Sequence, residues 1–184
     1  QGQWEKVMKA NLSAFKDVGK DAPVEQVSWD DCQNFMKELN TKNSSALLFR
    51  LPTEAEWEYA CRGGKQSKNF EYSGSASLDE VGWFRDNSSG KTHPVGKKKP
   101  NELGLYDMSG NVWEWCQDWF GEYPKEPEKD PQGAKSGSNR VLRGGGWNID
   151  AGYCRSASRF SYAPSYRNSD LGLRLCFAPS VSAR

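Results

Sequence analysis

The stretch Gly104-Leu-Tyr-Asp-Met-Ser-Gly-Asn-Val-Trp-Glu-Trp115 constrains the fold more than any other part of the chain. It brings Tyr106, Trp113 and Trp115 close to two glycines, with short polar side chains between them. Large rings bury much apolar area, and a buried indole N–H needs a hydrogen-bond acceptor. Short acids and amides beside glycines typically bond the backbone of a turn. We therefore expect residues 104–115, the hub, to be irregular and tightly packed, and the alternation after residue 111 predicts a strand that leaves it.

Capping boxes predict the two main helices. In a capping box, an N-cap hydroxyl and a carboxylate three residues later each accept a backbone N–H of the first turn. Ser28 with Asp31 begins a helix whose apolar positions follow a helical spacing and which ends within residues 40–45. Thr53 with Glu56 begins a second helix, which the glycines at 63 and 64 end. Both helices are expected to pack against the core.

The remaining segments are shorter or irregular. The spacing of Trp4, Val7 and Met8 predicts a short helix at the start. Residues 65–101 are expected to be mostly loop with a short strand at 81–84, and residues 121–139 a long surface loop. Residues 140–147 and 171–177 alternate as strands do, whereas 148–170 is predicted to be irregular. The length fits one domain, and no internal repeat is visible.

Composition and charge exclude several functions. A formal net charge of +1 gives no reason to expect nucleic acid or an anionic membrane as a partner, and the short run at 97–99 is expected in solvent. No apolar run reaches membrane-spanning length, and no signal peptide is visible. The single histidine, His93, and five cysteines without a CxxC pair offer no closely spaced zinc ligands. The cysteines are Cys32, Cys61, Cys116, Cys154 and Cys176.

The hub resembles the signature of the formylglycine-generating-enzyme (sulfatase-modifying-factor) family, whose fold is a variant of the C-type lectin fold. The resemblance covers nearly the whole chain through the segments 23–31, 50–64, 140–147, 155–159 and 171–175. It implies a single α+β domain over residues 1–184, with small twisted antiparallel sheets, two helices and extensive loops. The opening residues resemble the middle of the family's first helical region, so we expect the natural protein to continue upstream. The motifs specify the fold more than the activity, because one fold hosts many functions.

The resemblance does not extend to the oxidase chemistry of this family. Its oxidase members hold copper with two cysteines near the C-terminus, and thiolates suit Cu(I). Aligned on the Arg-Val-x-Arg-Gly-Gly start, Ile149 stands where the first cysteine is expected, and Gly146 replaces a serine. Cys154 matches the second cysteine but cannot build the site alone. We therefore expect no enzyme, and a metal-dependent oxidase is the least favoured alternative.

Other catalytic sets are also missing from the sequence. Related iron-dependent sulfoxide synthases use histidine ligands, and this chain has only one histidine. Glu54 and Glu58 share a helix face, but beside Arg62 they are expected to be ion-paired surface groups. No Ser–His–Asp set can be assembled.

By the same resemblance, the hub matches a structural calcium site. The matching groups are Asp107, Glu114 and the carbonyl groups of Gly110 and Val112. Oxygen ligands of this kind suit Ca²⁺. The alternative is that these groups only hydrogen-bond the loop, because buried polar groups need partners. No cofactor is expected to be required.

Residues 148–173 differ in composition from the rest of the chain. They contain no Lys, Glu, Gln, Met or Trp, although these types are frequent elsewhere in the chain. By composition alone, a window of this length would lack all of them well under about one time in a hundred. The missing types cannot be produced by changing the first two bases of an AAC or AAT codon. We call residues 147–173 the candidate variable segment.

This pattern resembles the variable proteins of diversity-generating retroelements, whose adenine-directed mutagenesis edits the last part of a C-type-lectin-fold receptor. Their formylglycine-enzyme-like group, which includes a treponemal surface variable protein, is the best match. The resemblance implies an invariant frame of Trp147, Arg155, Arg159, Arg167, Gly172 and Arg174. It implies a ligand surface of Asn148, Ile149, Asp150, Gly152, Tyr153, Phe160, Ser161, Tyr162, Ala163, Ser165, Tyr166, Ser169 and Asp170. Tyr, Ser, Gly and Asp are the types that adaptable binding surfaces use.

The sequence thus favours non-catalytic recognition of a ligand, expected to be a protein. If the retroelement resemblance holds, the protein is displayed on a bacterial or phage surface, as a lipoprotein for example. Truncating Tyr153, Phe160, Tyr162 and Tyr166 to alanine is expected to abolish binding and leave the thermal midpoint nearly unchanged.

The main alternative is a diverged, inactive interaction module, such as a kinase-linked sensor or a carbohydrate binder. Sugar binding would need a calcium-dependent Glu-Pro-Asn type of loop. Only Pro100-Asn101-Glu102 resembles such a loop, and its residues are in the wrong order.

Overall fold

The computed structural model describes residues 1–45 and 47–179. The two main helices begin at their predicted capping boxes, and the short helix at the start is also present. The helices are α1 (Gly2–Met8), α2 (Trp29–Thr41), α3 (Glu54–Cys61) and α4 (Leu78–Val81), with 3-10 turns η1 (Lys16–Val18), η2 (Gly64–Gln66) and η3 (Ala151–Cys154). The strands are β1 (Leu47–Arg50), β2 (Trp113–Trp119), β3 (Arg140–Arg143), β4 (Arg159–Tyr162), β5 (Leu171–Leu173) and β6 (Cys176–Pro179).

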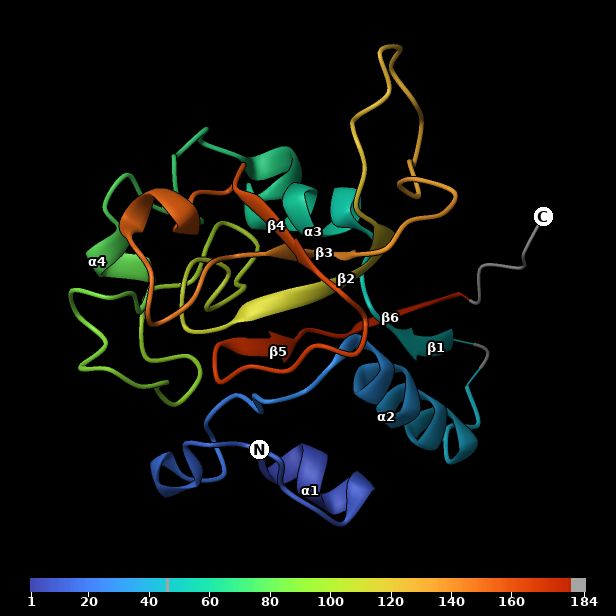
Figure 1. The fold of residues 1–184 in the computed structure, drawn as a ribbon. Coiled ribbons are helices and arrows are strands. Elements are labelled where there is room, and N and C mark those ends of the chain that lie inside the picture. The colour runs from blue at the N-terminus through green and yellow to red at the C-terminus, as the bar shows by residue number, and fades with distance from the viewer. Residues whose placement is uncertain (46, 180–184) are drawn as a thin grey trace.

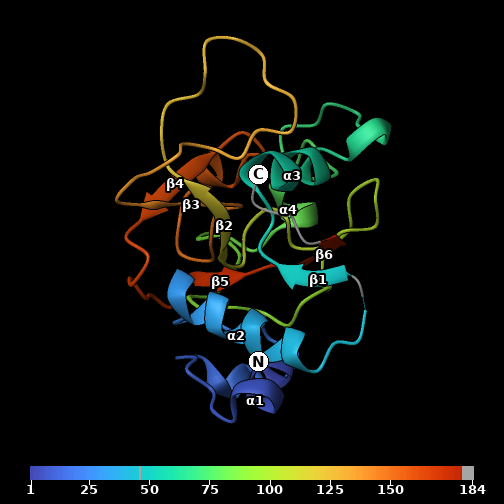
Figure 2. The same cartoon turned by 90° about the vertical axis from the view of Figure 1, so that its right-hand side faces the viewer.

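A four-stranded sheet in the order β4-β3-β2-β5 forms the centre of the molecule (Figure 1). The strand that leaves the hub is β2, which pairs antiparallel with β3 and parallel with β5. The parallel pair departs from the all-antiparallel sheets that the resemblance implied. Helix α3 lies on one side of this sheet and α1 and α2 on the other, and Figure 2 shows the same layers from the side. Strands β1 and β6 form a separate antiparallel pair. The α+β class and the predicted fold family are confirmed.

The capping boxes have the predicted geometry. The Ser28 hydroxyl accepts the Asp31 N–H at 3.1 Å, and the Thr53 hydroxyl accepts the Glu56 N–H at 3.2 Å. In each box the carboxylate accepts the backbone N–H of the N-cap residue in return. These bonds satisfy the first N–H groups of both helices, which therefore begin where the sequence predicts.

Apolar side chains from both helices and the sheet form the core. The largest cluster joins α1 and α2 to β2, β3 and β5, and it includes Trp4, Phe35, Leu51, Trp113, Trp115, Leu142 and Leu171. A second cluster, built around Trp57 of α3 and Val141 of β3, lies on the other face of the sheet. Because the sheet is covered on both faces, its central strands are buried on both faces and show no simple alternation.

Two strand predictions in the less regular parts were wrong. Residues 81–84 contain the end of α4 and an extended stretch, because the Gly82 N–H closes a helical turn on Leu78 at 2.8 Å. The backbone of Gly82 packs so closely against the Ser109 carbonyl of the hub that a Cβ there would lie 2.2 Å away. Residues 171–177 form two strands in different sheets, since β5 pairs with β2 and β6 pairs with β1.

The limits of two further segments also differ from the prediction. Residues 140–147 stay in the sheet only as far as Arg143, since Gly144 and Gly145 follow at φ +98° and +80°. Residues 148–170 were expected to be irregular, but they contain η3 and the edge strand β4. Strand β4 pairs with β3 over its whole length, so the sheet itself extends into the candidate variable segment.

Candidate functional site

The hub is the irregular, tightly packed region that the sequence predicts. Asp107, Gly110 and Asn111 all have φ between +57° and +86°, the left-handed region that favours glycine, asparagine and aspartate. The Asn111 side chain exchanges two hydrogen bonds with the His93 backbone, both at 3.0 Å. Glu114 accepts the Trp57 indole N–H at 2.6 Å and a two-bond contact from Arg174 at 2.8 and 2.9 Å. The Asn111 and Glu114 side chains therefore hold the turn together through hydrogen bonds.

The hub residues do not fit a calcium ion well. Both Glu114 oxygens are already bonded to the Arg174 guanidinium, whose positive charge opposes a second cation at the same carboxylate. Asp107 offers one oxygen without a partner, while its other oxygen accepts the Gly96 N–H at 2.8 Å. Burial raises the pKa of Asp107 above its ordinary value. The calcium site therefore stays a prediction, and the geometry favours the alternative of a hydrogen-bonded loop.

The candidate variable segment is tied to the body of the protein by its backbone. The carbonyl groups of Ile149, Pro164 and Asn168 accept N–H groups from Arg85, Asp30 and Gln26 at 3.0–3.3 Å, and the Ser156 N–H binds the Glu71 carbonyl at 2.9 Å. None of these bonds depends on the identity of a side chain in the segment. The backbone route of the segment is therefore compatible with many sequences.

The predicted frame arginines add ion pairs at the segment's borders. Arg159 binds Glu54 of α3 through two bonds of 2.8 and 2.6 Å, and Arg167 binds Asp31 of α2 at 2.6 and 2.7 Å. Arg174 binds Glu114 of the hub. Each of these three arginines thus joins the segment to a different part of the scaffold.

Two other frame residues act differently from these arginines. The Arg155 side chain stays within the segment and donates to the Gly152 carbonyl at 2.9 Å. The Trp147 indole donates to the Ser169 carbonyl at 3.0 Å and so joins the two ends of the segment.

The α3 carboxylates are only partly the surface groups that the sequence predicted. Glu58 does pair with Arg62, at 2.7 Å. Glu54, however, is only 5% exposed and is bonded to Arg159, with Arg143 3.5 Å away. Arg143, which is fully buried, also pairs with Glu58. The prediction of an ion-paired surface for Glu54 was wrong, because β4 places a cation over it that lies far away in the sequence.

Three aromatic side chains of the predicted ligand surface lie in a row, which we call the aromatic row: Phe160, Tyr162 and Tyr166. The ring centres of Phe160 and Tyr162 are 5.1 Å apart, and those of Tyr162 and Tyr166 are 4.3 Å apart. Phe160 also lies 5.8 Å from the buried ring of Trp113. Phe160 and Tyr166 are each 41% exposed, whereas Tyr162 is half-buried against the core. The row thus presents aromatic area from β4 and from the stretch that follows it.

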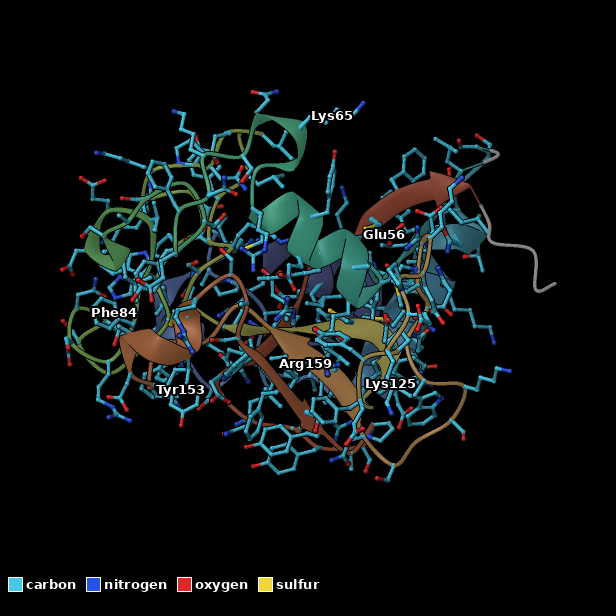
Figure 3. The ribbon with its side chains drawn as sticks, turned by 90° about the horizontal axis from the view of Figure 1, so that it is seen from above. Glu56, Lys65, Phe84, Lys125, Tyr153 and Arg159 are labelled. Atoms are coloured by element: carbon cyan, nitrogen blue, oxygen red, sulfur yellow. The ribbon has the colours of Figure 1, made fainter. Side chains whose placement is uncertain are left out.

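The other predicted contact residues range from exposed to buried. Tyr153 projects from η3 and is exposed (Figure 3). Exposed positions also include Asp150, Gly152, Ala163 and Ser165, and half-buried positions include Asn148, Ile149, Ser161 and Ser169. Asp170 is only 6% exposed and accepts a bond from the Asn148 amide at 3.1 Å. In this structure Asp170 therefore lies inside the protein and holds the start of the segment through its bond with Asn148.

The positions matched to the copper cysteines lie together but are apolar in character. Ile149 and Cys154 contact the same small hydrophobic cluster, with Leu78, Val81 and Phe84. Burial raises the pKa of the Cys154 thiol to about 12, so this group is a neutral thiol at physiological pH. Bis-thiolate copper coordination needs two thiolates, and of these two positions only Cys154 carries a thiol.

Some residues around the segment could not be found from the sequence. Arg85 donates to the Asp150 carboxylate at 2.5 Å and to the Asn148 carbonyl at 3.1 Å. The Phe15 ring meets Trp147 edge-on at 5.2 Å. Both residues come from loops far away in the sequence, and no local pattern distinguishes them from ordinary loop residues. Trp113 beneath Phe160 had a signal, since it was already identified as part of the hub.

The fold is that of a C-type-lectin-type domain, and comparison with known proteins gives the family. Residues 1–178 match the sulfatase-modifying factor enzyme 1-like domain, and the chain belongs to this family. Among solved structures it is similar to Treponema denticola variable protein 1, with a TM-score of 0.87 and 35% identity over 97% of this chain and 81% of that one.

Curated relatives include proteins named as enzymes. The chain is 38% identical to the formylglycine-generating enzyme of Streptomyces coelicolor, over 83% of this chain and 51% of the relative. It is 36% identical to the chaperone protein LppX of Paenibacillus barcinonensis, over 80% of this chain and 66% of the relative. The chain therefore spans about half to two thirds of these relatives. Family membership alone fixes neither catalysis nor binding as its activity. Among the described residues, no helix is both long and apolar enough to cross a membrane.

Proposed function

We propose that this chain is the non-catalytic binding domain of a variable receptor, which recognises a protein ligand through the outward side chains of the candidate variable segment. In this proposal a diversity-generating retroelement edits the codons of those side chains. The receptor is displayed on a bacterial or phage surface as a lipoprotein, because diversification is useful where targets vary.

The observation that carries the proposal is that one face of β4 anchors the strand and the other face presents the aromatic rings. Arg159 points to one face and is fixed by Glu54 of α3, while Phe160 and Tyr162 share the other face. Successive strand residues alternate between faces, so the anchoring residue and the ring-bearing residues do not compete for space. The ligand face can therefore change without loss of the anchor. Large rings beside small polar residues also give adaptable contact at low entropic cost.

Two further findings support recognition over catalysis. The structure similar to this one over 97% of the chain bears the name of a variable protein. The position matched to the first copper cysteine holds Ile149, packed in the same apolar cluster as Cys154. The enzymes among the relatives make oxidase activity the competing proposal, and that proposal requires a second thiolate beside Cys154.

Sequencing the gene tests the proposal directly. The 3′ end of this gene would be deep-sequenced from one cultured population and from sister isolates. Substitutions confined to the first and second bases of adenine-containing codons between residues 147 and 173 are expected. A uniform sequence, or changes as frequent in the hub as in the segment, would contradict variable display and favour a diverged family member with one fixed partner.

A further inference from the structure

A cavity lies on the face of β4 opposite the aromatic row. It has a volume of about 630 Å³ and separates α3 from the loop of residues 121–139, with Arg159 in its lining. Figure 3 shows Arg159 between α3 and the loop that carries Lys125. The volume is within the range of about 300–1,000 Å³ that is usual for ligand sites. None of the residues that line it is a predicted variable position.

Part of the cavity wall is apolar and aromatic. Tyr59 of α3 is 56% exposed and Tyr123 of the loop is 60% exposed. The loop also contributes three prolines to the lining, Pro124, Pro127 and Pro131. The Tyr123 hydroxyl binds Glu54 at 3.2 Å, and a β-bridge joins Trp119 to Ala134. These contacts hold both ends of the loop against the body, so the cavity is built by packed elements.

The carboxylate of Asp118, which lines the cavity, forms no ion pair among the described residues, although its charge acts on the Arg140 guanidinium. Asp118 is 4% exposed and accepts one hydrogen bond, from the Glu54 N–H at 2.8 Å. Gly133, at φ +75°, packs against its other oxygen so closely that a Cβ would lie 2.8 Å away, so only glycine fits at this place. The cations closest to α3 are already paired, since Arg159 binds Glu54 and Arg143 binds Glu58.

The charges around Asp118 increase its need for a cation. Burial raises the pKa of Asp118 to about 6, with smaller contributions from the carboxylates of Glu54 and Glu56. The group is therefore mostly ionised at neutral pH although it is buried. Three more carboxylates, from Glu122, Glu126 and Glu128, line the cavity against the single cation of Lys135 in the loop. A buried charge without a partner is unfavourable, so a cation brought here by a ligand would be stabilised.

We propose that this cavity binds a lysine or arginine side chain presented by an extended segment of a protein partner. The charged head approaches Asp118, and the apolar stem lies along the prolines. Long basic side chains bury their stems against apolar surface in this way. The exposed tyrosine rings attract the same cation through their faces. The cavity lining contains none of the predicted variable positions, so the site acts independently of whatever the candidate variable segment binds and does not rest on the proposed receptor function.

The test uses capped tripeptides and nuclear magnetic resonance of the whole chain. The probe is acetyl-Ala-Lys-Ala-amide, with an arginine version beside it. The matched control is the norleucine version, which keeps the apolar stem and lacks the charge. We expect saturable shifts at Tyr59, Tyr123 and Gly133 with the basic probes, and binding at least tenfold weaker with norleucine.

Three variants separate this site from general charge attraction. Asp118→Asn keeps an acceptor for the Glu54 N–H and removes the charge, and it is expected to weaken binding at least tenfold. Asp130→Asn removes a negative charge from the loop of residues 121–139 outside the cavity lining, and it is expected to change binding less than twofold. Ala55→Arg places a tethered cation at the wall and is expected to block the probe.

The proposal would be overturned by an absence of shifts at the cavity with either basic probe. Equal binding of the norleucine peptide, or unchanged binding by Asp118→Asn, would also contradict it. Shifts spread over the acidic loop and lost equally in Asp130→Asn would show nonspecific attraction instead.

Discussion

The hub and the candidate variable segment are both irregular, but they are stabilised in different ways. In the hub the side chains themselves make the structure, since Asn111 and Glu114 bond the backbone and side chains of distant segments. In the candidate variable segment the backbone and the frame arginines make the structure, and most ring-bearing side chains face outward. Under the proposed function, this difference would let the segment change its sequence while the hub keeps its own. It also predicts that equal substitutions have unequal effects in the two regions.

The largest effect is expected from Glu114→Ala in the hub. The substitution leaves the Arg174 guanidinium and the Trp57 indole without their acceptor, and Glu114 is only 4% exposed. Breaking a buried ion pair from one side typically costs about 3–5 kcal/mol, so we expect a loss in this range in the free energy of unfolding. Urea denaturation measures it. A loss below about 1 kcal/mol would contradict the contrast between the hub and the segment, because the hub would then not depend on its side chains.

Arg159→Ala tests the frame of the candidate variable segment. The guanidinium is 19% exposed, binds Glu54 and the Gly121 carbonyl, and lies over the rings of Phe120 and Tyr123. We expect the free energy of unfolding to fall by about 2–3 kcal/mol, less than for the hub because this pair is less buried. Hydrogen exchange of the β4 amides is expected to accelerate as well. Unchanged exchange in β4 would show that the backbone bonds alone hold the segment.

Asp118→Asn tests a buried carboxylate of β2 that, unlike Glu114 with Arg174, forms no ion pair. The folded-state pKa of Asp118 is raised to about 6, above its ordinary value of 3.8, so protonation favours the folded state. Its stabilising contribution is complete below about pH 4 and is lost as the pH rises through about 6. We expect the variant to be more stable than the parent at pH 7.5, on the order of 1 kcal/mol, and to lose this pH dependence. Parallel stability curves from pH 4 to 8 would contradict the account.

Truncating the aromatic residues of the segment one at a time is expected to have unequal effects on the free energy of unfolding. Tyr153→Ala and Tyr166→Ala remove exposed rings and are expected to change the free energy of unfolding by less than about 0.5 kcal/mol. Tyr162→Ala is expected to cost about 1–2 kcal/mol, because this ring is half-buried against the core. The sequence-based expectation treated these rings alike, and the structure separates Tyr162 from the others. A cost above about 2 kcal/mol for Tyr153 or Tyr166 would place those rings in the core.

Calcium is expected to have the smallest effect of all. Because Arg174 occupies both Glu114 oxygens, 1 mM of CaCl₂ (about the concentration that binds weak extracellular sites) should shift the thermal midpoint by less than about 1 °C. The midpoint is measured after EDTA treatment and again with calcium added. A rise of several degrees that Asp107→Ala abolishes would establish the hub as a calcium site.

The parts of the fold that depend on local chemistry could be predicted from the sequence. The capping boxes at Ser28 and Thr53 placed both helices, and the glycines and short polar residues placed the hub. What could not be predicted are pairings between distant segments. The split of residues 171–177 into β5 and β6 depends on which strand lies beside each half. The burial of Glu54 depends on Arg159, which lies 105 residues away in the chain.

The candidate site was predictable to a similar degree. Composition identified the segment, and the family motifs identified its arginines. Its geometry was not accessible, because alternation along β4 matters only once β3 is known to lie beside it. Asp170 shows the limit clearly, since a codon argument cannot tell that the side chain is buried. The cavity beside Asp118 had no sequence signal at all, because its walls come from α3, β2 and a long loop.

The most direct test of the central claim is a complete single-substitution scan of residues 147–173, read as the folded fraction of a surface-displayed library. The account predicts that the exposed positions accept nearly every residue type: Asp150, Gly152, Tyr153, Phe160, Ala163, Ser165 and Tyr166. It predicts that Trp147 and Arg159 accept few. Equal sensitivity at the exposed and the frame positions would contradict the account, because the segment would then be an ordinary part of the core.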